Sequence, residues 1–239
     1  MPNEKEYFNF EDKTVDFPFY SNGKFFQDKK SYVLIASLLL FVFLIFGPVK
    51  FYDYQEQAIL SLVMLIPLLY YGEGRLCTLF RKPVMKDLRT VIFSCVAYFP
   101  YIFIVISIGV LFESILGINI VSTISNTAGN LDLVFLIFEF IQIIGEELFR
   151  VILFLVVLTI CFKYSGNRKT SIIIGTIIAL AVFGLMHINS YPNILYCFVV
   201  MGIGNFFELY PYLKSKNVLL SIIVHFILNI IITVIRLNL

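Results

Sequence analysis

The sequence predicts an all-α protein, a polytopic membrane helix bundle with about seven transmembrane helices. Hydrophobic residues make up 59% of its 239 residues and charged residues only 14%, and the mean hydropathy is +0.91. A soluble domain has about 25% charged residues. The apolar residues also gather in runs close to the length, roughly 20 residues, that a helix needs to cross a bilayer.

Seven apolar runs meet this length or nearly do, at 32–49, 57–72, 90–112, 131–162, 171–188, 193–209 and 218–237. The fourth run is too long for one perpendicular crossing, so we expect it to be tilted or to include an interfacial turn at one end. The chain is therefore expected to consist of an N-terminal tail, residues 1–31, and a membrane domain, residues 32–239.

Lysine and arginine set the expected orientation. Basic residues precede the first run and fill the second, fourth and sixth loops, whereas the alternate loops carry one basic residue between them, Lys50. Cytoplasmic loops are the ones enriched in Lys and Arg, so the pattern predicts a multi-pass cell-membrane protein with a cytoplasmic N-terminus. The net charge of +2 is too small to indicate nucleic acid. Expected partners are the lipid bilayer and a membrane-associated substrate.

Glu146, Glu147 and Arg150 lie inside the fourth apolar run, in the stretch IIGEELFRVIL. A charge near the bilayer centre costs roughly 2.5–3.5 kcal/mol on insertion scales, so such groups usually face a protein interior and serve a function. On a helix, Glu146 and Arg150 share a face at i and i+4, with Glu147 about 100° away. Gln142 and Glu139 extend the Glu146 face as secondary pocket lining. The alternative is a set of interfacial charges at a helix end.

The two histidines of the chain lie in later runs. His187 ends the fifth run, and His225 lies in the last, where Asn229 shares its face at i+4. Counting from the span ends places Glu146 level with either histidine, depending on which end of the long fourth run is used. The alternatives are an interfacial His187 and a His225–Asn229 pair that only hydrogen-bonds between helices. Glu208 is expected to be an interfacial charge.

The stretches GEELFR, FGLMH and HFILN resemble the three motifs of the CPBP family, the CAAX proteases and bacteriocin-processing enzymes, also called the Abi family. Those motifs are a Glu pair followed by Arg, then Phe-x-x-x-His, then His-x-x-x-Asn. Their order and spacing agree over about residues 90–235, and the second and third motifs are met in full. In the first, the family usually has three residues between the Glu pair and Arg, whereas here two intervene, Leu148 and Phe149.

This shortened motif allows two alignments. If the Glu pair is the anchor, Glu146 corresponds to the catalytic glutamate of the family and Glu147 to the second glutamate. If Arg150 is the anchor, Gly145 stands at the catalytic position and Glu146 at the second. We prefer the first alignment, because GEEL is a frequent opening of this motif in bacterial members of the family.

The resemblance implies an intramembrane protease. Glu146 would take a proton from water that His187 helps to hold, and His225 with Asn229 would stabilise the tetrahedral oxyanion. Arg150 would pair with Glu146 or Glu147. The implied catalytic residues are Glu146, Glu147, Arg150, His187, His225 and Asn229. If a divalent metal such as zinc is used, its ligands would be Glu146, His187 and His225; a metal-free glutamate mechanism fits the same residues.

The resemblance further implies a membrane-associated peptide or protein as substrate. Bacterial members of the family are linked to peptide maturation or bacteriocin self-immunity, and the bias toward Ile, Phe, Lys and Asn is typical of an AT-rich bacterial genome. The rival hypothesis is a non-proteolytic polytopic protein, either a transporter or an immunity protein that sequesters a peptide, because buried charges also mark ion pathways.

Overall fold

In the computed structural model, the residues described are 6–18, 20, 25, 28–52, 54–72, 79–116, 132–191 and 193–237. They form helices joined by turns, and no strand occurs among them, which confirms the predicted all-α class. Residues 1–5 of the predicted tail lie outside the described part, whereas residues 6–18 pack against the helices.

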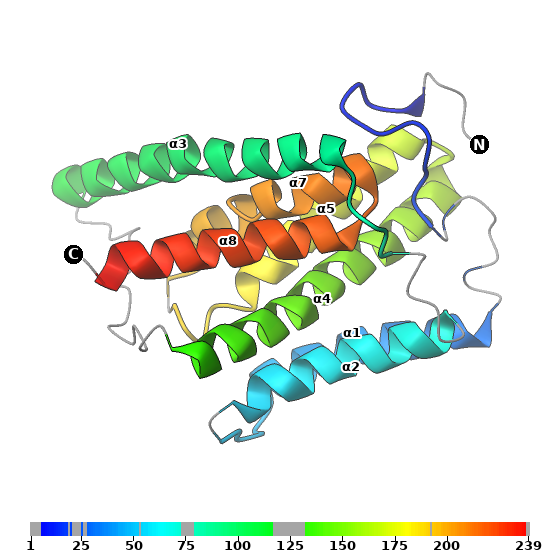
Figure 1. The fold of residues 1–239 in the computed structure, drawn as a ribbon, viewed down its shortest axis with the longest axis horizontal. Helices are drawn as coiled ribbons and strands as arrows, with labels where there is room; N and C mark the ends of the chain where they lie inside the picture. The colour runs from blue at the N-terminus through cyan, green and yellow to red at the C-terminus, as the bar shows by residue number, and fades with distance from the viewer. Residues whose placement is uncertain are drawn as a thin grey trace.

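Each of the seven apolar runs contains helix. The elements in chain order are α1 (Lys29–Phe46), α2 (Gln55–Tyr71), α3 (Met85–Leu116), α4 (Leu133–Ser165), α5 (Arg168–Leu185), α6 (Ile194–Tyr196), the π-helix η3 (Cys197–Ile203), α7 (Phe206–Ser215) and α8 (Val218–Leu237). Figure 1 shows α1 and α2 on one side of the bundle and α3 on the other. The central helix is α4, which packs against α1, α2, α5 and α8.

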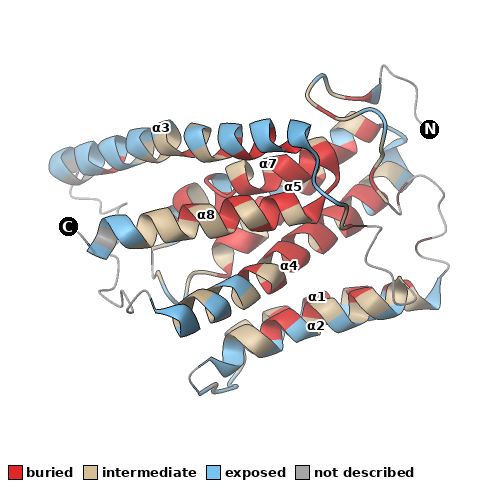
Figure 2. Cartoon of the chain, in the orientation of Figure 1, coloured by how far each residue is buried: buried red, intermediate tan, exposed pale blue. Residues whose placement is uncertain are grey.

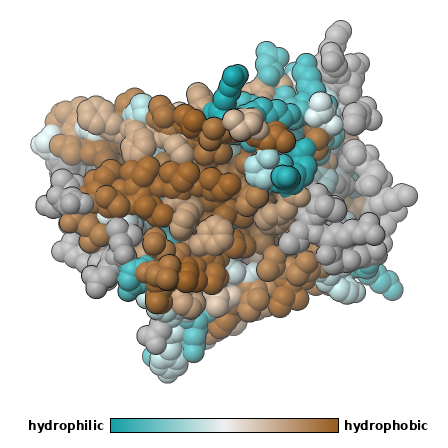
Figure 3. All heavy atoms as spheres, viewed as in Figure 1, coloured by the Kyte–Doolittle hydropathy of each residue, from teal (hydrophilic) through white to brown (hydrophobic). Residues whose placement is uncertain are grey.

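The outer helices present large apolar side chains to their surroundings. Leu39 of α1 is 69% exposed and Phe103 of α3 is 73% exposed, and the buried residues gather on the inner faces of α4, α5, α7 and α8 (Figure 2). The surface in this view is mostly hydrophobic, with hydrophilic residues gathered near the N-terminal segment (Figure 3). Such a surface is typical of helices that face lipid.

Five helical segments in the described residues are long and apolar enough to cross a membrane: Lys29–Phe46, Met85–Phe112, Arg168–Leu185, Ile194–Ser215 and Val218–Ile235. Helix α2 is a shorter apolar helix. Helix α4, which carries the charges of the fourth run, is not among these five. It is continuous over its 33 residues, so no interfacial turn interrupts Leu133–Ser165.

Both ends of α4 have clear local causes. The side chain of Asp132 caps its start, accepting a hydrogen bond from the Phe135 amide at 2.7 Å. Gly166 ends it in the left-handed conformation, with φ 63°, which glycine adopts without steric cost. Asn167 then caps α5 by accepting from the Thr170 amide at 3.1 Å. Helix α5 therefore folds back directly along α4.

The segment from α6 to α7 contains the π-helix η3 and lies against α5. A side chain at Gly184 of α5 would collide with this segment, since a Cβ there would lie 2.9 Å from the Gly202 Cα. The close approach brings the start of α7 toward the centre of the bundle. A π-helix adds a residue to the helical turn and is often found at functional sites.

Candidate active site

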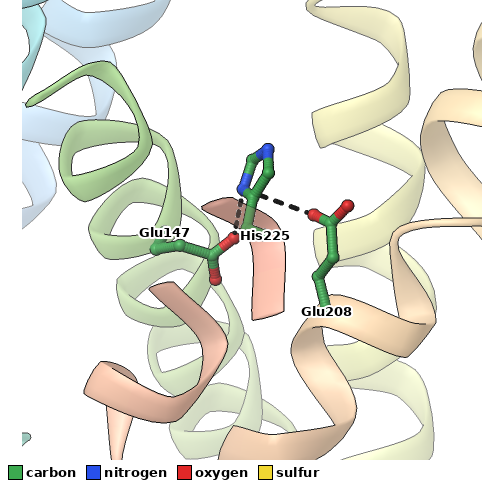
Figure 4. A group of neighbouring side chains, drawn as sticks. All are labelled: Glu147, Glu208 and His225. Atoms are coloured by element: carbon green, nitrogen blue, oxygen red, sulfur yellow. Dashed lines mark hydrogen bonds and ion pairs between the residues drawn. The ribbon is translucent and has the colours of Figure 1, made fainter. Parts of the chain in front are cut away.

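Glu147 is the buried centre of the site. It lies on α4 and is fully shielded from solvent. Its Oε1 accepts a hydrogen bond from Arg150, one turn further along α4, and lies 2.8 Å from Nδ1 of His225 on α8. Figure 4 shows the His225 ring between this carboxylate and that of Glu208. Two of the predicted site residues, Arg150 and His225, therefore both contact a third, Glu147.

Arg150 connects α4 to two other segments. It is fully buried, and its Nη1 donates to Oδ1 of Asn205 and to Oε2 of Glu208, the latter at 3.2 Å. The guanidinium carbon lies 4.8 Å from the ring centre of Phe183 on α5. The predicted pairing of Arg150 with one glutamate is thus a pairing with two, Glu147 and Glu208.

Glu208 is a buried member of the site, so the prediction of an interfacial charge is wrong. It is 5% exposed, lies in the first turn of α7, and its Oε2 is 3.3 Å from Nδ1 of His225. Asn205, just before α7, is a further residue that the sequence analysis missed. One signal was present, since Glu208 is the one acidic residue in the apolar segment 194–215 and such residues usually serve a function.

Glu146 occupies the opposite side of the His225 ring. Its Oε2 lies 3.7 Å from Nε2 of His225, and its Oε1 accepts a hydrogen bond from Gln142 at 2.7 Å. The Glu146 side chain is 16% exposed, whereas that of Glu147 is fully buried. The two adjacent glutamates therefore differ in environment, one at a partly open edge and one sealed in the interior.

Asn229 extends the same edge along α8. Its Nδ2 donates to Oε1 of Glu139 on α4 at 2.8 Å, and both residues are half-buried. With Gln142 and Glu146 they form a polar stripe between α4 and α8. The i+4 spacing that placed Asn229 on the His225 face therefore also places it opposite α4.

His187 lies beside the cluster without joining it. It lies in the turn after α5, where its Nδ1 is 2.9 Å from the Phe183 carbonyl oxygen in the last turn of that helix and its ring centre is 4.9 Å from that of Phe183. In the part of the chain that the structure describes, no hydrogen bond or ion pair joins His187 to Glu146 or His225. Counting along the apolar runs placed Glu146 level with either His187 or His225. The structure places it beside His225.

Position 145 faces a different helix. A Cβ at Gly145 would lie 2.9 Å from the Cα of Ser61 on α2, and the Ser61 hydroxyl donates to the Ile141 carbonyl. This face of α4 is a close helix–helix contact with no space for a longer side chain. Gly145 therefore packs against α2, whereas Glu146 and Glu147 both lie beside His225.

A cation site is the other arrangement that these residue types suggest. Glu147, Glu208 and His225 offer ligand atoms within 4.8 Å of one another, a set different from the predicted Glu146, His187 and His225. However, Arg150 already bonds to Oε1 of Glu147 and to Oε2 of Glu208. The other oxygen of Glu147, Oε2, is buried and has no hydrogen-bond partner. A divalent ion would have to displace the guanidinium, so the residues do not fit a resident metal.

A helix bundle with lipid-type outer faces, and with two glutamates, an arginine and a histidine joined in its interior, defines a membrane protein with a buried acid–base site. Residues 128–231 match the family model described as Type II CAAX prenyl endopeptidase Rce1-like. This part of the chain is an Rce1-like domain of the CPBP family, which confirms the predicted resemblance and implies a protease.

The match extends from the segment before α4 to the middle of α8 and includes every site residue described above. Comparison with curated proteins and with solved structures finds no significant match.

Proposed function

We propose that this chain is an intramembrane endopeptidase that hydrolyses a membrane-associated peptide or protein with water activated by Glu146. The observation that carries the proposal is the 3.7 Å separation of Glu146 Oε2 and His225 Nε2 at the partly exposed edge of the site. Two atoms at this separation can both contact one water molecule. The sealed side of His225, toward Glu147, leaves no such space.

In the proposed reaction Glu146 acts first as a base. It takes a proton from the water as the water oxygen bonds to the peptide carbonyl carbon, and the carbonyl electron pair moves onto its oxygen. Glu146 then returns the proton to the leaving amine as the C–N bond breaks and the C=O bond re-forms. Glu146 ends unchanged, and one water and one peptide bond give a carboxylic acid and an amine.

The oxyanion requires donors on the same edge. His225 Nε2 and the second N–H of the Asn229 amide, whose first is engaged by Glu139, are the donors that we propose for it. Glu147 and Arg150 hold the His225 ring from the sealed side. His187 supports Arg150 through Phe183 in this scheme and takes no direct part in proton transfer.

We further propose that the N-terminus is cytoplasmic. Basic residues from the first turn of α3, the start of α5 and the turn after α7 meet around the N-terminal segment. Lys86 contacts Asp12 at 2.7 Å, and Arg168 and Lys216 contact Glu11 at 2.6 and 2.7 Å. One end of the bundle thus gathers the positive charge that marks a cytoplasmic face. The predicted division into a tail, residues 1–31, and a membrane domain, 32–239, stays a proposal, and it is supported by the docking of Glu11 and Asp12 on the bundle.

For the biological role we propose bacterial peptide processing or bacteriocin self-immunity. The support is the residue bias described above together with the protease family. The test is incubation of the protein in proteoliposomes with labelled membrane peptides, including a prenylated C-terminal peptide and its unprenylated form, followed by mass spectrometry. Cleavage at a defined bond of any of them supports the protease proposal.

Three variants decide whether the site described here performs the cleavage. Loss of a general base or an oxyanion donor lowers rates by about 10²–10⁴-fold, so we expect Glu146→Ala and His225→Ala to lose cleavage to that extent. Glu56→Gln, an exposed carboxylate on α2, is the matched control and should cleave like the wild type. Equal cleavage by all of them would exclude the proposed site. Peptide binding by the wild type without cleavage would favour the sequestering alternative.

A further inference from the structure

Glu208 gives the buried cluster an excess of negative charge. Glu147, Glu208 and Arg150 are each 5% exposed or less, so two carboxylates face one guanidinium. A buried charge without a partner is strongly unfavourable. The remaining group in contact with both carboxylates is His225, with Nδ1 at 2.8 Å from Glu147 and 3.3 Å from Glu208.

Two features stabilise the ionised form of Glu208. Its Oε2 lies within reach of two N–H donors, Arg150 Nη1 at 3.2 Å and His225 Nδ1 at 3.3 Å, and a hydrogen bond from the cationic guanidinium is stronger to a charged oxygen than to a neutral one. Glu208 also lies in the first turn of α7, where the helix dipole favours a negative side chain.

The direction of the His225 ring follows from these contacts. Because Nδ1 faces the two carboxylates, a proton on Nδ1 is donated inward. The opposite atom, Nε2, faces the Glu146 edge, where the proposed reaction needs a donor. A neutral ring with its proton on Nδ1 has no N–H on Nε2. Only the doubly protonated ring has an N–H both toward the two carboxylates and toward the Glu146 edge.

We propose that Glu208 is a positioning residue that keeps His225 doubly protonated, so that Nε2–H is a donor toward the reacting carbonyl oxygen. Glu147 alone does not suffice, because its charge is balanced by Arg150, and Glu146 lies further from the ring, 3.7 Å from Nε2, at the partly exposed edge. Glu208 supplies the second negative charge, which the imidazolium balances. The catalytic consequence rests on the proposed protease function, whereas the protonation state of His225 can be measured without any substrate.

The experiment is nitrogen NMR of the full chain in detergent micelles, with ¹⁵N-labelled histidine. The chain has two histidines, so His187→Gln assigns the signals of His225. At pH 7.5 we expect both His225 nitrogens to be protonated in the wild type. In Glu208→Gln, which keeps the shape and removes the charge, we expect one nitrogen to lose its proton. Glu208→Asp should retain the imidazolium, and Glu56→Gln should match the wild type.

Kinetics supply the second readout. We expect kcat of Glu208→Gln to fall about 10²-fold, the effect of losing one oxyanion donor, with KM little changed and partial rescue in Glu208→Asp. A neutral His225 in the wild type, or an unchanged imidazolium in a folded Glu208→Gln, would overturn the proposal. If no peptide is cleaved, the protease function fails separately while the NMR result still decides the role of Glu208.

Discussion

Replacing Glu11 with glutamine removes the central charge of an ion cluster that fixes the N-terminal segment to the bundle. We call Glu11, Asp16, Arg168 and Lys216 the N-terminal clamp. Glu11 is 6% exposed, and its two oxygens accept from Arg168 at 2.8 and 2.6 Å and from Lys216 at 2.7 Å. Because Lys216 lies between α7 and α8, the clamp holds the turn that joins the helices bearing Glu208 and His225.

The magnitude follows from what stays buried after the substitution. Arg168 and Lys216 are each 2% exposed, and removing one partner of a buried ion pair costs about 3–5 kcal/mol. Asp16 continues to accept from Arg168 at 2.9 Å, which places the expected loss at the lower end. We therefore expect Glu11→Gln to lower the free energy of unfolding by about 3 kcal/mol at pH 7.

The pH dependence of this loss has a definite sign. Burial alone would raise the pKa of Glu11, but the hydrogen bonds from Arg168 and Lys216 outweigh it and hold the pKa below its ordinary value of 4.5. A carboxyl group whose pKa is lower in the folded state stabilises that state above the unfolded pKa. Its contribution disappears as the pH falls through the folded pKa. The difference in the free energy of unfolding between wild type and Glu11→Gln should therefore be constant down to about pH 4.5 and become smaller below that pH.

The assay is denaturant unfolding in mild detergent, followed by far-ultraviolet circular dichroism from pH 7 to the acid limit of the folded protein. Glu56→Gln is the matched control, since exposed substitutions usually change stability by less than about 0.5 kcal/mol. A gap below about 1 kcal/mol at pH 7 would refute the reasoning, because a broken buried pair costs more than that. A difference in unfolding free energy that stays unchanged below about pH 4.5 would show that the charge of Glu11 is not its cause.

Three further predictions concern the site. Arg150→Met, which leaves Glu147 and Glu208 buried with His225 as the one counter-charge in contact with both, should lower the free energy of unfolding by about 3–5 kcal/mol, with Arg150→Lys less affected; equal stability of Arg150→Met and wild type would contradict the buried cluster. Gly145→Ala should cost about 1–3 kcal/mol by overpacking against Ser61, and a neutral effect in the same unfolding assay would deny the close contact of α4 with α2. Chelators should leave peptide cleavage unchanged and elemental analysis should find no stoichiometric metal; activity lost to a chelator and restored by zinc would show that a cation displaces Arg150.

The positions of the helices were readable from the sequence because a bilayer-length apolar run has few alternatives. The sequence left open whether Arg150 pairs with Glu146, which shares its helix face, or with Glu147. Arg150 turned toward Glu147 at i−3 because both are sealed in the interior, whereas Glu146 points to the open edge. Helical spacing gives the set of possible neighbours, and burial decides among them.

Glu208 and Asn205 could not be placed by helical spacing alone. The π-helix η3 precedes them, and its extra residue per turn rotates everything that follows relative to a regular helix. The sequence predicted that His187 lies with Glu146. In the structure the ring of Phe183 packs both on His187 and on Arg150, a detail of packing that no spacing rule contains.

The N-terminal clamp could not be predicted from the sequence for a different reason. A polar segment without apolar periodicity predicts a tail, and Glu11 meets Arg168 across 157 positions of sequence. A buried pair at that separation follows from the folded bundle, because α5 and the turn between α7 and α8 must first be brought together. The sequence shows charges of opposite sign in both places and gives no indication that they meet.

The central claim is that Glu146 activates water for peptide hydrolysis, and Glu146→Gln tests it most directly. Once a cleaved peptide is known, binding and single-turnover cleavage would be measured on the same proteoliposome sample. The account predicts peptide binding within a few-fold of wild type and cleavage slower by at least about 10². Cleavage by Glu146→Gln at the wild-type rate would contradict it.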